Sequence, residues 1–322
     1  MRSRAVVMAY VLVALVTAPV AVLLTRAALP TRASAAPPVA TASESPPASA
    51  PVAHLQAIPQ PPPPGPVIGV PADPAAVRGP GYLTFFGWAL LDRHTGQLTG
   101  SANRETVGNT TESMIKVWIA ADYLRHQKGQ PPASAVNELY QMIIHSDDTI
   151  AHRYYGINGG DASISELISL CGLRGTHLPS LANSWSYTTM SPADAVRLGQ
   201  CVATGKAAGP VWTGWLLNAM HNVQGGVADQ QAHTGGGHWG IVDALPAAIA
   251  AHVSIKNGWT AQVYDHNWHI NCLAVHPDWV LAIELRYPWT SPDGDWHRAN
   301  NLQPGADACR LVTRQLLVTP DG

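Results

Sequence analysis

The sequence predicts a single α+β domain in which a helical segment is inserted between the strands of one sheet. Strand-like segments lie at both ends of the folded part, and segments with helical periodicity fill the middle. Strands from both ends can form one sheet only if the helices between them are an insertion. The 322 residues are 46% hydrophobic and 12% charged, so enough apolar surface is available for a large core.

The strands and helices are expected in a definite order. Residues 82–91 are apolar and aromatic, and a turn at residues 92–96 joins them to a short strand through Leu98, which predicts a β-hairpin. Ser191 and Pro192 form a good helix start, with the serine as cap. Helices are expected at residues 113–125, 133–144, 164–170, 192–203, 211–220 and 306–317. Later strands are expected at residues 252–255, 269–276 and 279–286.

A hydrophobic segment lies near the N-terminus. Arg2 and Arg4 precede residues 5–24, which contain no charged side chain. Two interpretations remain open: a signal peptide cut after the small residues 33–35, or a membrane anchor with both arginines inside the cell. Both place the bulk of the chain outside the cytoplasm. The first cysteine is Cys171, so no N-terminal cysteine can carry a lipid.

Composition divides the chain into three parts. Residues 1–35 are the signal peptide or anchor, residues 36–78 a linker rich in proline and alanine, and residues 79–322 the folded domain. The linker is expected to hold the domain away from a membrane or wall, and membrane contact is confined to the N-terminal segment. The net charge of −2 and the pI near 6.7 give no reason to expect a nucleic-acid partner. We expect a monomer.

The chain has four cysteines, an even number that suggests two disulfides in an exported protein. Three pairings are possible. Cys171 and Cys201 lie in helical segments in the middle of the chain, whereas Cys272 and Cys309 lie in a late strand and the last helix. We therefore expect the pairs Cys171–Cys201 and Cys272–Cys309.

Ser113 and Lys116 form an S-x-x-K pattern at the start of a predicted helix. This spacing puts the hydroxyl and the amine on one face of the helix. A lysine that burial or crowding has made neutral can take the proton of the serine and create a nucleophile. The serine also lies where backbone N–H groups can hold an oxyanion. The alternative is a serine that caps the helix and a solvated lysine.

Two further motifs follow in the chain. Ser146 precedes two aspartates, the second of which is Asp148, and its hydroxyl can relay a proton to a leaving group. The alternative is a helix cap with acidic residues in the first turn. Lys256, Asn257 and Gly258 follow a strand, where an ammonium can bind a substrate carboxylate and lower the pKa of the first lysine. Gly258 would let an extended substrate lie against the strand. The alternative here is an ordinary turn.

In this order the three motifs resemble the S-x-x-K, S-D-N and K-T-G set of class A β-lactamases and penicillin-binding serine peptidases. Similar stretches lie at residues 146–151, 157–160, 172–178 and 188–192, so the resemblance covers about residues 82–317. It implies that family's fold, an antiparallel sheet flanked by helices. Lys116 and Ser146 are 30 positions apart, which implies a shortened all-helical lobe. Exported actinobacterial proteins with an S-D-D variant are similar.

The resemblance implies a role for each motif residue. Ser113 would be the acylated nucleophile, Lys116 its base and Ser146 the proton relay. Lys256 would bind the substrate carboxylate and tune the pKa of Lys116, and the backbone N–H groups of Ser113 and Trp259 would form the oxyanion hole. The expected substrate-binding residues are Lys256, Asn257, Gly258, Trp259 and Asp148.

Several departures from the family pattern bear on the activity. Residues 178–191 contain no Glu or Asp, although class A β-lactamases place there the glutamate that activates the deacylating water. Asp148 replaces an asparagine, and its carboxylate can pair with a lysine and raise that lysine's pKa. Asn257 replaces a threonine. The family's carboxylate-binding arginine is missing, and protonated His266 or His269 could take its place.

We therefore expect an extracytoplasmic serine hydrolase that forms an acyl-enzyme with a β-lactam or a D-Ala-D-Ala-type cell-wall peptide and is weak as a β-lactamase. No cofactor is implied. The fourteen histidines include no carboxylate–histidine array with zinc-like spacing, so no metal site is expected. The alternative is a catalytically inactive wall- or ligand-binding protein on the same fold.

Overall fold

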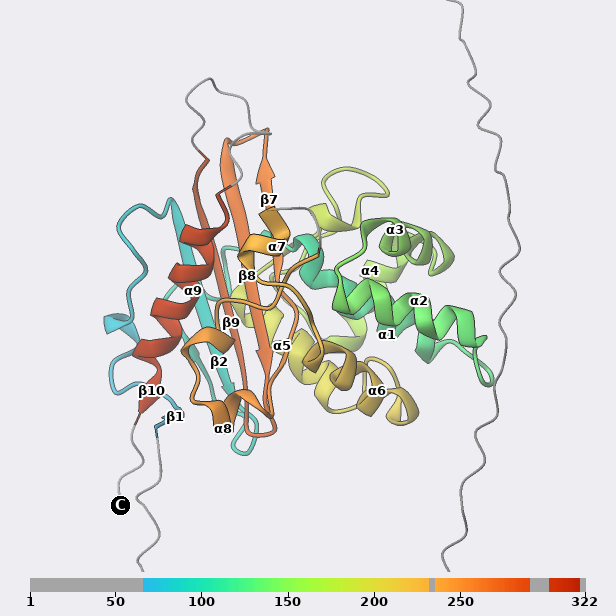
Figure 1. The fold of residues 1–322 in the computed structure, drawn as a ribbon, viewed down its shortest axis with the longest axis horizontal. Helices are drawn as coiled ribbons and strands as arrows, with labels where there is room; N and C mark the ends of the chain where they lie inside the picture. The colour runs from blue at the N-terminus through green and yellow to red at the C-terminus, as the bar shows by residue number, and fades with distance from the viewer. Residues whose placement is uncertain (1–65, 232–234, 290–300, 319–322) are drawn as a thin grey trace, which may run out of the picture. The chain divides into compact units, whose positions relative to one another are not determined.

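A computed structural model describes residues 66–231, 235–289 and 301–318. Its main sheet is antiparallel, with the strand order β3-β2-β9-β8-β6, and β7 also pairs with β8 (Figure 1). The early hairpin therefore lies beside strands from the end of the chain, as expected for a helical insertion. The strands of this sheet are β2 (Phe85–Asp92), β3 (Leu98–Gly100), β6 (Ser254–Ile255), β7 (Gly258–Gln262), β8 (Asn267–Val275) and β9 (Trp279–Pro288).

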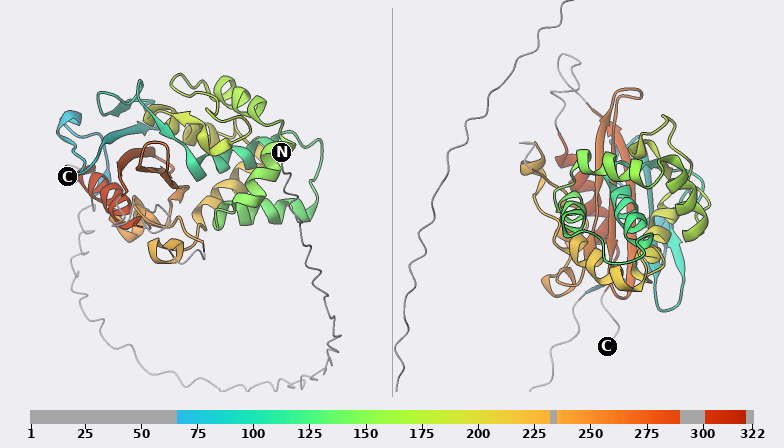
Figure 2. Two further views of the ribbon diagram at one scale, coloured as in Figure 1. Left: turned by 90° about the horizontal axis from the view of Figure 1, so that it is seen from above. Right: turned by 90° about the vertical axis from the view of Figure 1, so that its right-hand side faces the viewer.

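Helices cover both faces of the sheet. A Cβ added at Gly199 on α5 (Pro192–Ala203) would lie 3.3 Å from Leu273 and 3.2 Å from Val275 on β8. Cys272, which directly precedes Leu273 on β8, forms a disulfide with Cys309 on α9 (Gln303–Gln315). Successive side chains of a strand point to opposite faces. The two helices therefore pack on opposite faces, with α9 on the side away from the helical lobe (Figures 1 and 2).

The helical lobe forms around α1 (Lys116–Arg125), which contacts α2, α3, α4 and α6. Trp118 is fully buried there and its indole N–H donates to Ser163 on α4 at 2.9 Å. The Cys171–Cys201 disulfide joins α4 to α5. The remaining helices are α2 (Ala133–Ile144), α3 (Asp148–Ile157), α4 (Asp161–Cys171), α6 (Pro210–His221), α7 (Val227–Gln231) and α8 (Ala247–Ala250).

Most of the predicted elements are present. The helices predicted at residues 133–144 and 192–203 begin and end at the predicted residues. The Ser191 hydroxyl accepts from the backbone N–H of Asp194, as expected for a helix cap. Both predicted disulfides form. The helix predicted at residues 113–125 instead begins as a 3-10 turn, η2 (Glu112–Ile115), before α1. The short strands β4 (Asn109–Thr110) and β5 (Thr189–Met190), which pair with each other, were not predicted.

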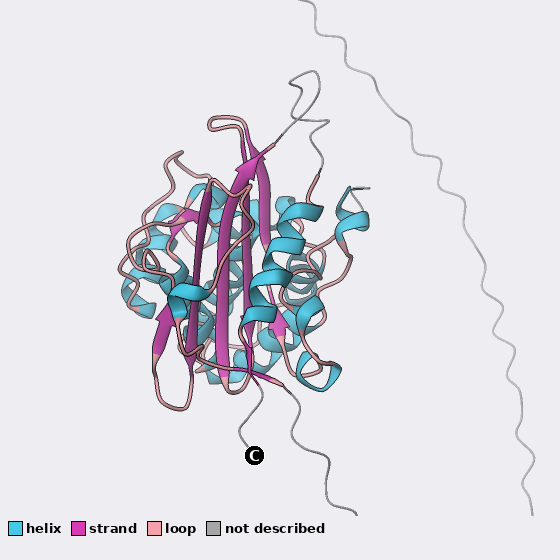
Figure 3. Cartoon of the chain, turned by 90° about the vertical axis from the view of Figure 1, so that its left-hand side faces the viewer, coloured by secondary structure: helices cyan, strands magenta, loops and turns pink. Residues whose placement is uncertain are grey.

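The folded part begins before the predicted boundary at residue 79. β1 (Val67–Ile68) pairs with β10 (Leu317–Val318) at the end of the chain, beside the main sheet (Figure 3). The backbone N–H of Arg78 also donates to Gln315 on α9 at 3.0 Å. The composition of residues 36–78 predicted a linker throughout. Composition alone cannot show that two apolar residues of such a segment will pair with a strand far away in the sequence.

The predicted signal peptide or anchor, and the linker up to residue 65, lie outside the described residues. Among the residues that are described, no helix is both long enough and apolar enough to cross a bilayer.

A carboxylic acid is buried in the centre of the sheet. Glu284 on β9 is fully buried, and burial raises its pKa well above the usual range. Its Oε2 accepts from the backbone N–H of Asn109 at 3.1 Å, but Oε1 has no hydrogen-bond partner among the described residues. Asn271, its cross-strand neighbour on β8, has an equally unpaired Oδ1. A proton on Glu284 would let these two oxygens pair.

Glu284→Gln should therefore gain stability relative to the wild type as the pH rises. An unfolded glutamate loses its proton near pH 4.3, whereas the buried one keeps it, so rising pH favours the unfolded wild type by up to about 1.4 kcal/mol per pH unit. Urea unfolding from pH 4 to pH 8 measures this difference. A free-energy difference between the two proteins that does not change with pH would show that Glu284 is not a buried neutral acid.

Candidate active site

A cavity of about 790 Å³ lies between the helical lobe and the β7 edge of the sheet. Ser113 on η2 and Ser146, just before α3, both line it. The loop at residues 183–187 forms another wall, and β7 forms the opposite one. Segments far apart in the sequence thus meet at one site. Of the eight predicted residues, Ser113, Ser146, Asp148 and Trp259 line the cavity, and Lys116 and Lys256 both contact Ser146.

Ser113 and Lys116 lie on consecutive turns of the chain. Ser113 is part of η2 and Lys116 is the first residue of α1, with its side chain completely buried. The Ser113 hydroxyl forms no hydrogen bond with any other described residue, so it is open to a molecule in the cavity. The predicted alternative of a solvated lysine is therefore wrong, because the helical lobe closes over Lys116.

Ser146 links the two buried lysines of the site. Its Oγ accepts from Lys116 Nζ at 3.2 Å and from Lys256 Nζ at 2.9 Å. Lys116 also donates to the backbone carbonyl of Ser146 at 2.6 Å. Ser146 has a φ of 60°, a left-handed conformation that a serine adopts at a cost of roughly 1–3 kcal/mol. That conformation presents both oxygens of one residue to the same lysine.

Burial lowers the pKa of both lysines. It is the main cause that lowers the pKa of Lys256 well below the usual range, and the positive charge of Lys116 lowers it further. Burial also lowers the pKa of Lys116, although Asp148 opposes this. The Asp148 carboxylate lies 2.5 Å from Lys116 Nζ but is largely exposed, so water screens its attraction. The predicted lysine–aspartate pair is thus present, but burial has the larger effect.

Lys256 and Asn257 occupy a break between two short strands. β6 and β7 lie one after the other along β8, and these two residues fall between them. The Asn257 amide donates to the carbonyl oxygens of Gly237 and Trp239 at 2.8 and 2.9 Å. Both of its N–H groups are therefore used to hold the neighbouring loop rather than offered to the cavity.

Gly258 permits a close contact within the protein that was not predicted. A Cβ at this position would lie 2.3 Å from the carbonyl oxygen of Thr111, 2.8 Å from Met114 N and 3.0 Å from Ser113 N. The glycine therefore lets β7 approach the turn that carries Ser113. This contact places the backbone of Ser113 close to Gly258, the residue before Trp259.

Aromatic rings cover the two ammonium groups. Lys116 Nζ lies 5.0 Å from the centroid of Trp185, and Lys256 Nζ lies 5.7 Å from that of Trp259. Trp185 belongs to η3 (Trp185–Tyr187), which contributes to the cavity wall. The rings exclude water while still attracting a positive charge. Trp185 was not predicted, because nothing in its sequence context connects it to a lysine about seventy positions earlier.

The structure overturns the proposed use of His269 as a substrate-binding cation. His269 on β8 is 1% exposed, and burial lowers its pKa to about 4. It does not line the cavity, and its two ring nitrogens contact Thr110 and Asp265. His266 does not line the cavity either.

One group of potential metal ligands occurs in the described part of the chain, outside the cavity. It consists of Asp122, His126 and Glu166 in the helical lobe. Arg125 already forms ion pairs with Asp122 at 2.7 Å and with Glu166 at 2.8 Å. This cation supplies the positive charge that a metal ion would bring, so the group is explained without one.

Comparison with known proteins gives the fold a name. No family model matches the chain. An ancestral class A β-lactamase superposes with a TM-score of 0.51 at 15% identity, covering 72% of this chain and 93% of that one. The chain has the class A β-lactamase fold. A mutant of PBP-A, solved as an acyl-enzyme complex with penicillin G, gives a TM-score of 0.51 at 16% identity over 73% of this chain and 89% of that one.

The sequence also resembles a mycobacterial protein. It is 28% identical over 211 residues to the protein named "Putative lipoprotein LppW" of Mycobacterium tuberculosis, and equally to that of Mycobacterium bovis. The match covers 62% of this chain, and the chain spans 62% of the length of these relatives.

The loop at residues 183–187 contributes no acid to the cavity. Residues 183–187 line the cavity with polar and aromatic side chains but no carboxylate. Among the described residues the cavity is lined by two acids, Asp148 and Glu112. Glu112 was not predicted although it directly precedes Ser113, because an acid at that position is no signal of a function until the fold places Gln262 beside it.

Gly258→Ala should destabilise the protein by about 1–3 kcal/mol, because the new methyl group cannot fit between β7 and the Ser113 turn without moving backbone. Gly129→Ala is the matched control, since a Cβ there would meet nothing within 4 Å and should change stability by less than about 0.5 kcal/mol. Urea unfolding of both variants compares them directly. Equal stability of Gly258→Ala and the wild type would contradict the close contact.

Proposed function

We propose that this protein is an extracytoplasmic active-site serine hydrolase in which Ser113 is acylated by a β-lactam or by a D-Ala-D-Ala-type cell-wall peptide. The observation that carries the proposal is the Ser146 hydroxyl, which contacts both Lys116 and Lys256 in the cavity that Ser113 also lines. Two buried lysines on one hydroxyl are costly for stability, so their presence at a cavity points to chemistry.

Acylation follows from the protonation states. Neutral Lys116 takes the proton of the Ser113 hydroxyl while the serine oxygen forms a bond to the substrate carbonyl carbon. The backbone N–H groups of Ser113 and Trp259 hold the negative oxygen. When the carbon–nitrogen bond breaks, Ser146 gives its proton to the leaving nitrogen and regains one from Lys116. Lys256 donates to the Ser146 hydroxyl and orients it.

Deacylation is proposed to be slow. No carboxylate in residues 183–187 lies where it could activate a water molecule, and the exposed Asp148 is paired with Lys116. The acyl-enzyme should therefore persist, which fits a penicillin-binding peptidase better than an efficient β-lactamase. The two disulfides and the name of the mycobacterial relative support a location outside the reducing cytoplasm.

A second candidate is a binding protein without turnover. The ion pair between Asp148 and Lys116 favours it, because a protonated lysine cannot act as a base. The same fold serves catalytic and non-catalytic proteins. The two candidates differ in whether Ser113 reacts.

The purified protein incubated with benzylpenicillin should gain the mass of one penicillin, and Ser113→Ala should not. Ser165→Ala, an exposed serine on α4 outside the cavity, is the matched control and should be acylated like the wild type. Intact-protein mass spectrometry over hours measures both the adduct and its loss.

Each outcome has a distinct meaning. A stable adduct absent from Ser113→Ala supports the slow acyl-enzyme. Rapid loss of penicillin without an adduct would contradict slow deacylation. Neither an adduct nor turnover would contradict acylation by this β-lactam and favour the binding protein.

A further inference from the structure

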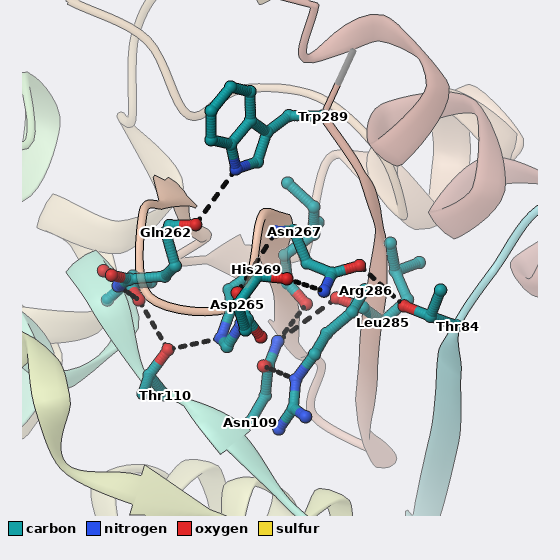
Figure 4. Close-up of polar contacts among 12 residues, drawn as sticks. Thr84, Asn109, Thr110, Gln262, Asp265, Asn267, His269, Leu285, Arg286 and Trp289 are labelled. Atoms are coloured by element: carbon teal, nitrogen blue, oxygen red, sulfur yellow. Dashed lines mark hydrogen bonds and ion pairs between the residues drawn. The ribbon is translucent and has the colours of Figure 1, made fainter. Parts of the chain in front are cut away.

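A hydrogen-bonded chain leads from the solvent to the residue before Ser113. Asp265 Oδ2 lies 2.8 Å from His269 Nε2, and His269 Nδ1 lies 2.6 Å from Thr110 Oγ1. Thr110 Oγ1 is also 2.6 Å from Glu112 Oε1 (Figure 4). We call these four residues the Glu112 chain. Asp265 at its outer end is partly exposed, whereas His269 and Glu112 are buried.

The number of protons available to Thr110 limits where one proton of the Glu112 chain can reside. The Thr110 hydroxyl has a single proton but lies within hydrogen-bond distance of two groups, the Glu112 carboxyl and His269 Nδ1. It can donate to one of them, so the other must donate to it. A proton must therefore reside either on the Glu112 carboxyl or on His269 Nδ1.

Burial favours the carboxyl as the place for this proton. It raises the pKa of Glu112 and lowers that of His269 to about 4. The consistent arrangement has Glu112 donating to Thr110, Thr110 donating to His269 Nδ1, and His269 Nε2–H donating to the Asp265 carboxylate. Every member then has a partner, and the negative charge stays at the exposed end.

The carboxyl of Glu112 also fixes the turn that carries Ser113. Glu112 has a φ of 48°, which costs roughly 1–3 kcal/mol for a residue with a side chain. Its Oε1 accepts from the Gln262 amide at 2.6 Å, at the far end of β7. Gly258 at the near end of the same strand contacts the same turn. The turn is thus held to β7 at two points, of which one is the Glu112 side chain.

We propose that Glu112 is a positioning residue that must be neutral for Ser113 to react, and that Asp265, His269 and Thr110 hold it in that state. The inference rests on the proposed acylation of Ser113. A neutral carboxyl anchors the strained turn without placing a negative charge beside the forming oxyanion.

Ionisation of Glu112 would disturb the site through several neighbours. The charged groups that act on it are Asp148, whose negative charge opposes its ionisation, and Lys116, whose proton it would help retain. Tyr264 also interacts with it, and His269 and Asp265 face it through Thr110. A charged Glu112 would therefore hold a proton on Lys116 and repel the oxyanion, and both effects slow acylation.

The test compares Glu112→Gln with Glu112→Ala in the full chain. Glutamine has the shape of the neutral acid and no ionisable group, and it can make one of the two hydrogen bonds of Oε1, to Gln262 or to Thr110, whereas alanine can make neither. Benzylpenicillin acylation rates are measured from pH 5 to pH 10. The alanine variant should be at least tenfold slower than the wild type throughout. Glutamine should recover most of that loss and should remove the decline that the wild type shows at alkaline pH.

Two results would overturn the proposal. The first is a glutamine variant as slow as the alanine variant at every pH, which would mean that an ionisable carboxylate is required. The second is the same alkaline decline in the glutamine variant and the wild type. Glu138→Gln, a partly exposed acid on α2 outside the cavity, controls for the loss of one charge and should follow the wild type.

A second measurement separates this inference from the proposed function. If the wild type is not acylated at any pH, the proposed function fails and the positioning role falls with it. The neutral carboxyl is still tested by urea unfolding, in which Glu112→Gln should gain stability over the wild type as the pH rises above about 4.3. A difference that is constant with pH would show that Glu112 is ionised in the fold and would overturn the proton assignment as well.

Discussion

The contact of two buried lysines with one serine hydroxyl is the constraint on which the site depends. Because Lys116 and Lys256 both lie within 3.2 Å of Ser146 Oγ, their nitrogens are at most about 6 Å apart, where two positive charges repel by roughly 3 kcal/mol at an effective dielectric constant of about 20. Burial adds a desolvation cost for each charge. The fold can hold this arrangement most easily when at least one lysine is neutral, and a neutral Lys116 is what the proposed acylation of Ser113 requires.

The surrounding structure keeps these groups in place at some cost. Of the four non-glycine residues with positive φ in the described part of the chain, Glu112, Ser146 and Asn183 line the cavity. Such strain persists where neighbouring contacts determine the backbone, and here those contacts are the Glu112 carboxyl, the lysines on Ser146 and the approach of β7 at Gly258. The rigid sheet, fixed to α9 by a disulfide, supplies the support.

Local patterns predicted much of this architecture. Helix starts such as Ser191–Pro192 and the three motifs have signals within a few residues, and the structure brings Lys116, Ser146 and Lys256 together as those motifs required. What sequence reasoning could not supply was pairing over long distances. The contact of Trp185 with Lys116, the β1–β10 pair and the use of the Asn257 amide by the 237–239 loop all depend on tertiary packing. Glu112 was visible in the sequence, but its importance depends on Thr110 and Gln262, which the fold places beside it.

Titration of the lysine side chains tests the central claim most directly. The chain has four lysines, so carbon-13 labelling at Cε gives four NMR signals, and Lys128→Arg and Lys206→Arg identify those of the two exposed residues. We predict that the remaining two signals, from Lys116 and Lys256, change at a pH below the usual value near 10.4. Asp148→Asn should move both signals to still lower pH, and that of Lys116 further, because Asp148 contacts Lys116 directly. Titration of both buried lysines near pH 10.4 would contradict the account, because neither could then serve as a base at neutral pH.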